Sequence, residues 1–147
     1  MDVNLMSVKI SYSKDVDGKQ KKINENYLVS GWSFGVTEKS IEDFFTKECY
    51  ENLIVEDISR TKIEEFVPNE KLEEPKFYSL KTATTYLDDN GKEKIQKHTY
   101  LIASDSTENA TNSFKNYMAN STEDFTIVGV VETNILDIFL SEADWDK

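Results

Sequence analysis

Two side chains in this sequence are of types that often carry out chemistry, and neither has partners at a catalytic spacing. His98 is the only histidine and Cys49 the only cysteine among the 147 residues. A general base needs a nucleophile to deprotonate and an acid to orient it, and none lies close to His98 in the sequence. The negative charge of Glu48 disfavours the reactive thiolate of Cys49. We therefore interpret His98 as a structural or surface histidine and Cys49 as an inert, partly buried side chain.

Two short acidic runs resemble the beginning of a calcium-binding loop, in which oxygen ligands recur along the chain. The runs are DVDGK, from Asp15, and DDNGK, from Asp88. Their glycines, Gly18 and Gly91, come too early, no glutamate stands at the twelfth loop position, and lysines intrude. The chain also lacks phosphate-loop, dinucleotide-binding, nucleophile-elbow and zinc spacings. The sequence therefore predicts hairpin turns at both runs, and a protein that is not an enzyme and needs no metal or cofactor.

The composition is that of one folded, soluble domain. Hydrophobic residues make up 38% of the chain and aromatic residues 12%, which is enough for a core. The 28 acidic and 17 basic side chains give a net charge of −11, which argues against general attachment to nucleic acid or to an anionic membrane. A single cysteine, no signal peptide and no apolar stretch of about 18 residues indicate a cytoplasmic protein without a membrane segment.

An internal repeat organises the chain, and it is found by sliding the sequence along itself by 73 residues. After a one-residue gap the match continues at an offset of 72. The matched positions include Asp15 with Asp88, Gly18 with Gly91, Lys19 with Lys92, Tyr27 with Tyr100, Leu28 with Leu101, Ile58 with Val130, Thr61 with Thr133 and Ile63 with Ile135. Such self-similarity is typical of two copies of one folding unit that bury their apolar faces together.

Each copy begins with a hairpin. Apolar and polar residues alternate on both sides of the acidic turns, which is the pattern of half-buried antiparallel strands. The pairs Asp17-Gly18 and Asn90-Gly91 suit the positive φ that tight hairpin turns need. The first hairpin is expected to return over residues 23–30, and the second to run out over 77–87 and return over 95–103.

A short helix and a β-rich closing segment complete each copy. Thr37 is expected to cap the first helix, and Asp105 or Ser106 the second, before an apolar stripe at helical period. The closing segments, 53–67 and 125–140, are long for single strands, so a bulge or bend is expected near Asp57 and near Gly129. The stripes comprise Ile41, Phe44 and Phe45 in the first helix and Ala110, Phe114, Tyr117 and Met118 in the second.

The predicted fold class is α+β, with two tandem ββαβ repeats that form mainly antiparallel sheet with two short helices and a pseudo-two-fold. Residues 1–147 form a single domain built from a repeat over 5–67 and a repeat over 77–140. The proline-containing segment 68–76 is the linker between them, and 141–147 is an acidic tail. Unpaired strand edges leave both a monomer and a homodimer open.

Several segments together resemble an uncharacterised, domain-of-unknown-function family of small proteins carried by phages and prophages of gut bacteria. The likeness covers about residues 9–140, and it includes YLVSGWSF, TEKSIEDFF, VEDISRTKIEEFV and VVETNILDIF. Its most specific positions are Asp57, Ile58, Arg60 and Lys62 in the middle and Val131, Glu132, Thr133, Ile135, Asp137 and Phe139 near the end. The resemblance implies a mobile-element gene and a protein of the host bacterial cytoplasm, and it supplies no catalytic residue.

Charge is unevenly distributed along the chain. Residues 38–74 have a net charge of −7 and residues 121–147 of −6, whereas 1–37 and 75–120, which contain the hairpins, are each +1. Regularly spaced carboxylates imitate phosphates and select basic partners. We therefore predict a non-catalytic phage or prophage accessory protein that binds a host or phage protein through an acidic surface. Inhibition of a nucleic-acid-handling or defence system is one form that this binding could take. The candidate partner-binding residues are Trp32, Phe34, Glu132, Asp137, Glu142, Asp144 and Trp145.

An alternative function is binding of single-stranded nucleic acid, in which basic hairpin tips hold the backbone and strand tyrosines stack on bases. The candidate basic residues are Lys19, Lys21, Lys22, Lys92 and Lys94, and the candidate tyrosines are Tyr12, Tyr27, Tyr86 and Tyr100. Lysines on hairpins are also a common protection of strand edges against aggregation. The repetition of Tyr27 as Tyr100 is equally consistent with a place in the core.

Overall fold

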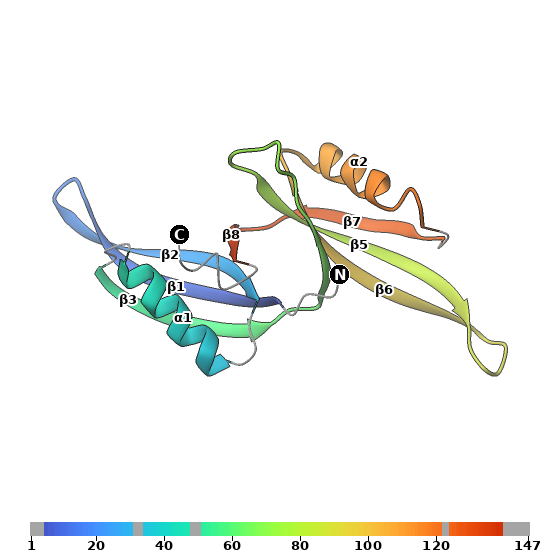
Figure 1. Ribbon diagram of the computed structural model, residues 1–147, viewed down its shortest axis with the longest axis horizontal. Helices are drawn as coiled ribbons and strands as arrows, with labels where there is room; N and C mark the ends of the chain where they lie inside the picture. Colours follow the sequence, from blue (N-terminus) through green and yellow to red (C-terminus); the bar gives the residue numbers. More distant parts are fainter. Residues whose placement is uncertain (1–4, 31–33, 48–50, 122–123, 140–147) are drawn as a thin grey trace. The chain divides into compact units, whose positions relative to one another are not determined.

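The computed structural model describes residues 5–30, 34–47, 51–121 and 124–139. Its strands form two four-stranded sheets, each with one helix packed on it (Figure 1). The chain divides into two compact units: unit 1 contains residues 62–133 and the first three residues, and unit 2 contains residues 4–61 and 134–147. Unit 1 is thus essentially one continuous segment, whereas unit 2 is assembled from two segments that are far apart in the sequence.

Unit 2 is built around sheet A, whose strand order is β3-β1-β2-β8. Strands β1 (Leu5–Val16) and β2 (Lys19–Ser30) form a long antiparallel hairpin, and β3 (Glu51–Arg60) pairs antiparallel with β1. Strand β8 (Ile135–Phe139) adds to β2 in parallel. Helix α1 (Phe34–Lys47) covers one face, where Ile41 and Phe45 join Val8 and Val29 in the core.

Unit 1 is built around sheet B, whose strand order is β4-β6-β5-β7. Strands β5 (Lys76–Leu87) and β6 (Glu93–Ser104) form the hairpin, and β7 (Thr126–Glu132) pairs antiparallel with β5. Strand β4 (Ile63–Val67) adds to β6 in parallel. Helix α2 (Thr107–Tyr117) places the fully buried Phe114 against Leu80, Tyr100 and Ile102.

Each closing segment is two strands, and the two strands belong to different sheets. The chain leaves β3 of sheet A and enters β4 of sheet B within two residues, and it passes from β7 to β8 in the same way. At the first crossing, the backbone N–H and the hydroxyl of Thr61 both donate to the carbonyl oxygen of Leu5. At the second, the same two groups of Thr133 both donate to the carbonyl oxygen of Phe77. The expected bulges are confirmed, because the register shifts at Glu56 between β1 and β3 and at Val128 between β5 and β7.

The two hairpin turns differ. Asp17 and Gly18 both have positive φ, 53° and 81°, as a two-residue turn between tightly twisted strands requires. The second turn is longer, and only Gly91 has positive φ, at 78°. The expectation that Asn90 shares this conformation is therefore wrong. The connection between β5 and β6 has five residues, against two in the first hairpin, and within it only glycine takes the left-handed conformation.

Helix α2 begins as predicted and α1 does not. The Ser106 hydroxyl accepts a hydrogen bond from the Asn109 N–H at 3.1 Å, which caps α2. Helix α1 already begins at Phe34, so Thr37 lies within it rather than at its cap, and Phe34 does not precede the helix. Tyr117 is also misassigned to the apolar stripe, because it is 45% exposed.

The structure is α+β, with mixed, mainly antiparallel sheets and two short helices. The parallel ladders at β4 and β8 arise from the crossings between sheets, and the sequence pattern does not reveal them. Neither of the described helices has the length and apolar character that a membrane crossing requires.

Candidate functional site

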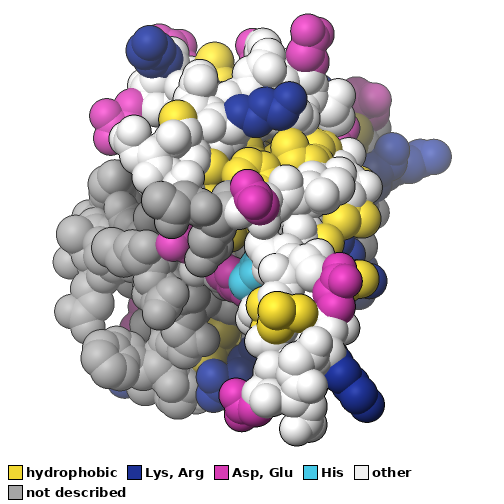
Figure 2. Space-filling model, turned by 90° about the vertical axis from the view of Figure 1, so that its right-hand side faces the viewer, with side chains coloured by type: hydrophobic (Ala, Val, Ile, Leu, Met, Phe, Trp, Pro, Cys, Tyr) yellow, Lys and Arg dark blue, Asp and Glu magenta, His cyan; other side chains and the backbone are white. Residues whose placement is uncertain are grey.

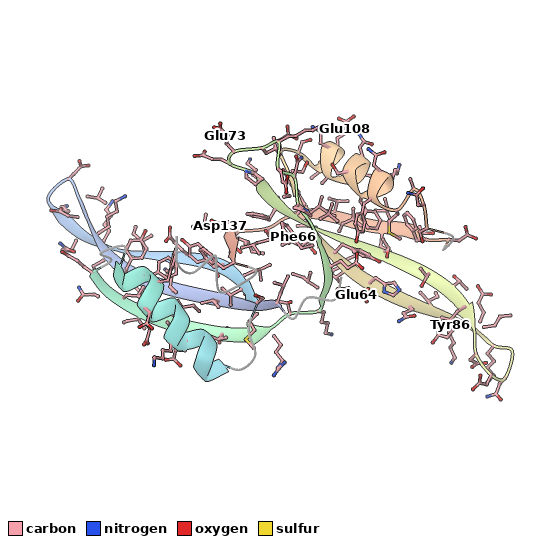
Figure 3. The ribbon with its side chains drawn as sticks, viewed as in Figure 1. Glu64, Phe66, Glu73, Tyr86, Glu108 and Asp137 are labelled. Carbon is pink, nitrogen blue, oxygen red and sulfur yellow. The ribbon has the colours of Figure 1, made fainter. Side chains whose placement is uncertain are left out.

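A hydrogen-bonded cluster on sheet B joins three strands through the single histidine. His98, on β6, lies with Nδ1 2.7 Å from Oε1 of Glu64, on β4, and with Nε2 3.3 Å from the Thr84 hydroxyl, on β5. The imidazole is largely buried and reaches the surface where Figure 2 shows it in cyan, and Glu64 is labelled in Figure 3. The spacing of the sequence does not reveal either partner, because Glu64 lies 34 residues and Thr84 14 residues from His98 along the chain.

The chemistry of the cluster follows from what each group can donate. A carboxylate only accepts, so Nδ1 of His98 donates to Glu64. Nε2 of His98 and the Gln96 carbonyl, at 3.3 Å and 3.4 Å, are both within hydrogen-bonding distance of the Thr84 hydroxyl. The cluster therefore fastens the edge strand β4 to the hairpin. The same order of hydroxyl, imidazole and carboxylate occurs in hydrolases, but those enzymes also need donors for an oxyanion.

A second contact attaches β4 to the helix. The hydroxyl of Tyr117, on α2, donates a hydrogen bond to the carboxylate of Glu65. This bond lowers the pKa of Glu65 from its ordinary value and is the main cause that raises the pKa of Tyr117 to about 12. Because a phenol that donates to a carboxylate stays protonated and a carboxylate that accepts stays ionised, the contact is held over the whole neutral range.

Four exposed carboxylates lie on the helix side of sheet A, and we name them the acidic face of unit 2. They are Glu38, Glu42 and Asp43 on α1 and Asp137 on β8. Strand β8 lies against the helix, because the Phe139 ring is 5.0 Å from that of Phe44, and Asp137 is two residues before Phe139 on the same side of the strand (Figure 3 labels Asp137). Within the described part of the chain, none of the four forms an ion pair.

These charges contribute little to the stability of the helix, because the attraction between Lys39 and Asp43, one turn apart, offsets the repulsion between Glu38 and Glu42. Glu38 and Glu42 are one helical turn apart, where like charges repel by a few tenths of a kcal/mol. Among the described side chains of α1, Lys39 is the only cation, and it is exposed. Asp137 was predicted from the sequence as a partner-binding residue, and the three helix carboxylates were not. The strongly acidic segment 38–74, in which all three fall, could have indicated them.

Other carboxylates are engaged within their own unit. Glu132, a predicted partner-binding residue, forms an ion pair with Lys76 at 3.2 Å and raises the pKa of that lysine. Glu56 accepts a hydrogen bond from the buried Ser11 at 2.7 Å and pairs with Lys22 at 3.0 Å; the Ser11 bond is the larger cause that lowers the Glu56 pKa. Glu132 belongs to unit 1 and Asp137 to unit 2, so the fold does not place these two residues in one element or sheet.

The residues predicted to bind nucleic acid differ in their exposure to solvent. The five lysines, Lys19, Lys21, Lys22, Lys92 and Lys94, are exposed at the hairpin ends. Tyr27 and Tyr100 are each only 8% exposed within the two cores, so neither can stack on a base in the folded protein. Tyr86 is 49% exposed and lies opposite Lys94 in the β5–β6 ladder.

Some predicted residues lie outside the part of the chain that the structure describes. These are Trp32, Cys49, Glu142, Asp144 and Trp145, and for Phe34 only the backbone is described. Within the described ranges, no three His, Cys, Asp or Glu side chains are grouped closely enough to hold a metal ion.

A comparison with protein families shows which family the chain belongs to. The model of a domain of unknown function, DUF4494, matches residues 4–141, which is nearly the whole chain. The protein belongs to the DUF4494 family. The match covers both sheets and both helices, so the DUF4494 domain is the complete two-unit arrangement and not one of its halves. No curated protein and no solved structure matches the chain.

Proposed function

We propose that this DUF4494 protein is a non-catalytic binding protein whose acidic face of unit 2 engages a basic protein, such as one that handles nucleic acid. The observation that carries the proposal is the set of four exposed carboxylates on α1 and β8, which form no ion pair with other described residues. They are held on regular elements over a packed core, so little backbone freedom is lost on binding. A net charge of −11 speeds the approach of a cationic partner.

The proposal includes a phage or prophage origin and a role as an accessory protein or inhibitor in the bacterial cytoplasm. It also includes the duplication of an ancestral unit, related by a pseudo-two-fold. The duplication is supported by the same order of elements in each half, by a bulge at the same place in each edge strand and by the equivalent Thr61 and Thr133 bonds. If two copies supply the scaffold, residues that differ between them are free to serve binding. The acidic face combines the α1 carboxylates of the first copy with Asp137 on β8 of the second copy.

The decisive experiment compares capture by two variants with the same change in charge. The tagged protein is used to capture partners from a lysate of the bacterium that carries the gene, at increasing ionic strength. The first variant neutralises the acidic face: Glu38→Gln, Glu42→Gln, Asp43→Asn and Asp137→Asn. The control neutralises four exposed carboxylates of unit 1: Glu70→Gln, Glu73→Gln, Glu74→Gln and Glu108→Gln.

The proposal expects one or more basic proteins that the wild type and the control retain and the first variant loses. Salt should release them, since exposed charges are screened. Equal recovery by all three proteins would show that the acidic face does not bind the partner. Purified partner and protein should then associate directly in titration calorimetry, with an affinity that falls with salt.

Binding of single-stranded nucleic acid is a second candidate, favoured by the exposed Tyr86 directly across from Lys94. An exposed ring beside a cation can stack on a base and contact its phosphate. Fluorescence anisotropy with labelled single-stranded DNA over a salt series tests it. The candidate predicts binding that weakens steeply with salt and is lost in Tyr86→Ala with Lys94→Gln, and no binding at low salt removes it.

A further inference from the structure

The far end of the β5–β6 hairpin exposes large apolar side chains on the sheet face away from α2. Strands β5 and β6 run on past the helix (Figure 1). Leu80 and Tyr100 pack under α2, and side chains alternate between faces without a register shift in this ladder, so Leu87 and Ile95 point to the opposite face. Leu87 is 70% exposed and Ile95 69%, more than any other large hydrophobic residue in the described part of the chain.

The fold does not require apolar residues at these positions. The two ladders can be aligned on Leu5 with Ser30 and on Phe77 with Ala103, because Leu5 and Phe77 accept the equivalent bonds from Thr61 and Thr133. In this structural alignment, which is shifted by one residue in the first strand from the sequence match, Asp15 takes the position of Leu87 and Lys22 that of Ile95. Charged residues therefore serve the same hairpin in unit 2. An exposed apolar pair that the architecture can replace with charges indicates an interaction surface.

This face is complementary to itself. Glu93, Ile95 and Lys97 alternate along β6 and so share the face, with an acid and a base at equal distances on either side of the isoleucine. A two-fold axis through Ile95, perpendicular to the strand, brings Ile95 onto Ile95 of a second copy. The same rotation places each Glu93 over Lys97 of the other copy, and each Leu87 over Ala83. Two-fold interfaces of this kind need only one surface that matches itself.

The local charge at this end allows a second copy to approach. Two chains with a net charge of −11 repel each other over most of their surface. Residues 85–97 carry three acidic and three basic side chains, so this end is locally neutral. Figure 2, which looks onto this end, shows hydrophobic side chains exposed between basic and acidic ones.

We propose that the protein forms a homodimer in which two β5–β6 hairpins pack face to face, with β6 antiparallel to β6 of the partner. Stacked sheets lie about 10 Å apart, a distance that Glu, Lys and Ile side chains span from both sides. Oligomeric state is measured on the full chain by sedimentation equilibrium and by light scattering after size exclusion, over a range of concentrations. Amide spectra confirm that each variant is folded.

The first variant is Ile95→Lys, which installs the residue that the first hairpin has. It places two lysines against each other on the axis and should weaken the dimer at least about tenfold. The matched control is Ile54→Lys on β3, which replaces another exposed isoleucine and should leave the dimer intact. Dissociation by both substitutions alike, or by neither, overturns the proposal.

Charge reversal gives a second test that a loss of folding cannot imitate. Glu93→Lys alone sets lysine against lysine, and Lys97→Glu alone sets glutamate against glutamate, so each variant should be monomeric. Mixed in equal amounts, the two variants place lysines against glutamates at both contacts and should form a heterodimer. A wild type that is monomeric at every concentration, or a mixture that does not associate, overturns the proposal and leaves this face to an unlike protein.

Discussion

Truncation of Phe114 to alanine is expected to destabilise both units, although the ring lies in only one of them. Phe114 is completely buried, and its ring centroid is 4.8 Å from that of Tyr100 and 5.3 Å from that of Phe125. Replacing a core phenylalanine by alanine costs about 3–5 kcal/mol. Amide protection in sheet B should therefore fall roughly a hundredfold to a few thousandfold.

The path of the chain transmits this loss to unit 2. Its two segments, 4–61 and 134–147, are joined only through unit 1. When unit 1 unfolds, the intervening chain becomes a loop of about 70 residues, whose closure costs about 4 kcal/mol. That cost opposes the pairing of β8 with β2. The converse does not hold: Phe45→Ala in the core of unit 2 leaves unit 1 continuous, so sheet B should keep its protection.

Native-state hydrogen exchange by NMR measures both effects in the same samples. Leu80 and Ile102 report on sheet B, and Val8 and Val29 on sheet A. Phe114→Ala should lower protection at all four, and Phe45→Ala only at the two valines. The reasoning is refuted if Phe45→Ala affects Leu80 and Ile102 as strongly as it affects the valines, or if Phe114→Ala leaves Val29 unchanged.

Three further predictions concern stability, measured by urea or thermal unfolding. Tyr117→Phe should lower the free energy of unfolding by about 0.5 kcal/mol at this half-exposed site. Because the Tyr117 hydrogen bond lowers the pKa of Glu65, this loss should be present at neutral pH and should vanish as the pH falls below the ordinary value of 4.5. Gly91→Ala should cost about 1–2 kcal/mol because of its positive φ, whereas Gly129→Ala, where φ is not positive and no atom lies within 4 Å of the added Cβ, should be nearly neutral. Ser106→Ala removes the cap of α2 and should cost about 1 kcal/mol.

The candidate site could be predicted only in part. The excess of carboxylates in 38–74 was visible in the composition, but the pairing of α1 with β8 through Phe44 and Phe139 depends on a strand that arrives from the far end of the chain. The partners of His98 were missed for the same reason. For the tyrosines of the nucleic-acid alternative, the repetition of Tyr27 as Tyr100 was equally consistent with base stacking and with a core position, and the structure places both in the cores.

Much of the local structure follows from the sequence alone. The hairpin at Asp17-Gly18, the cap at Ser106 and the bulges near Asp57 and Gly129 follow from backbone preferences and side-chain period, which act over a few residues. Which sheet each strand joins depends on tertiary packing. Residues 53–67 have one continuous β pattern, yet β3 and β4 separate at Thr61 because an edge strand can satisfy its backbone groups on any open sheet edge, and the choice between edges depends on packing against distant residues.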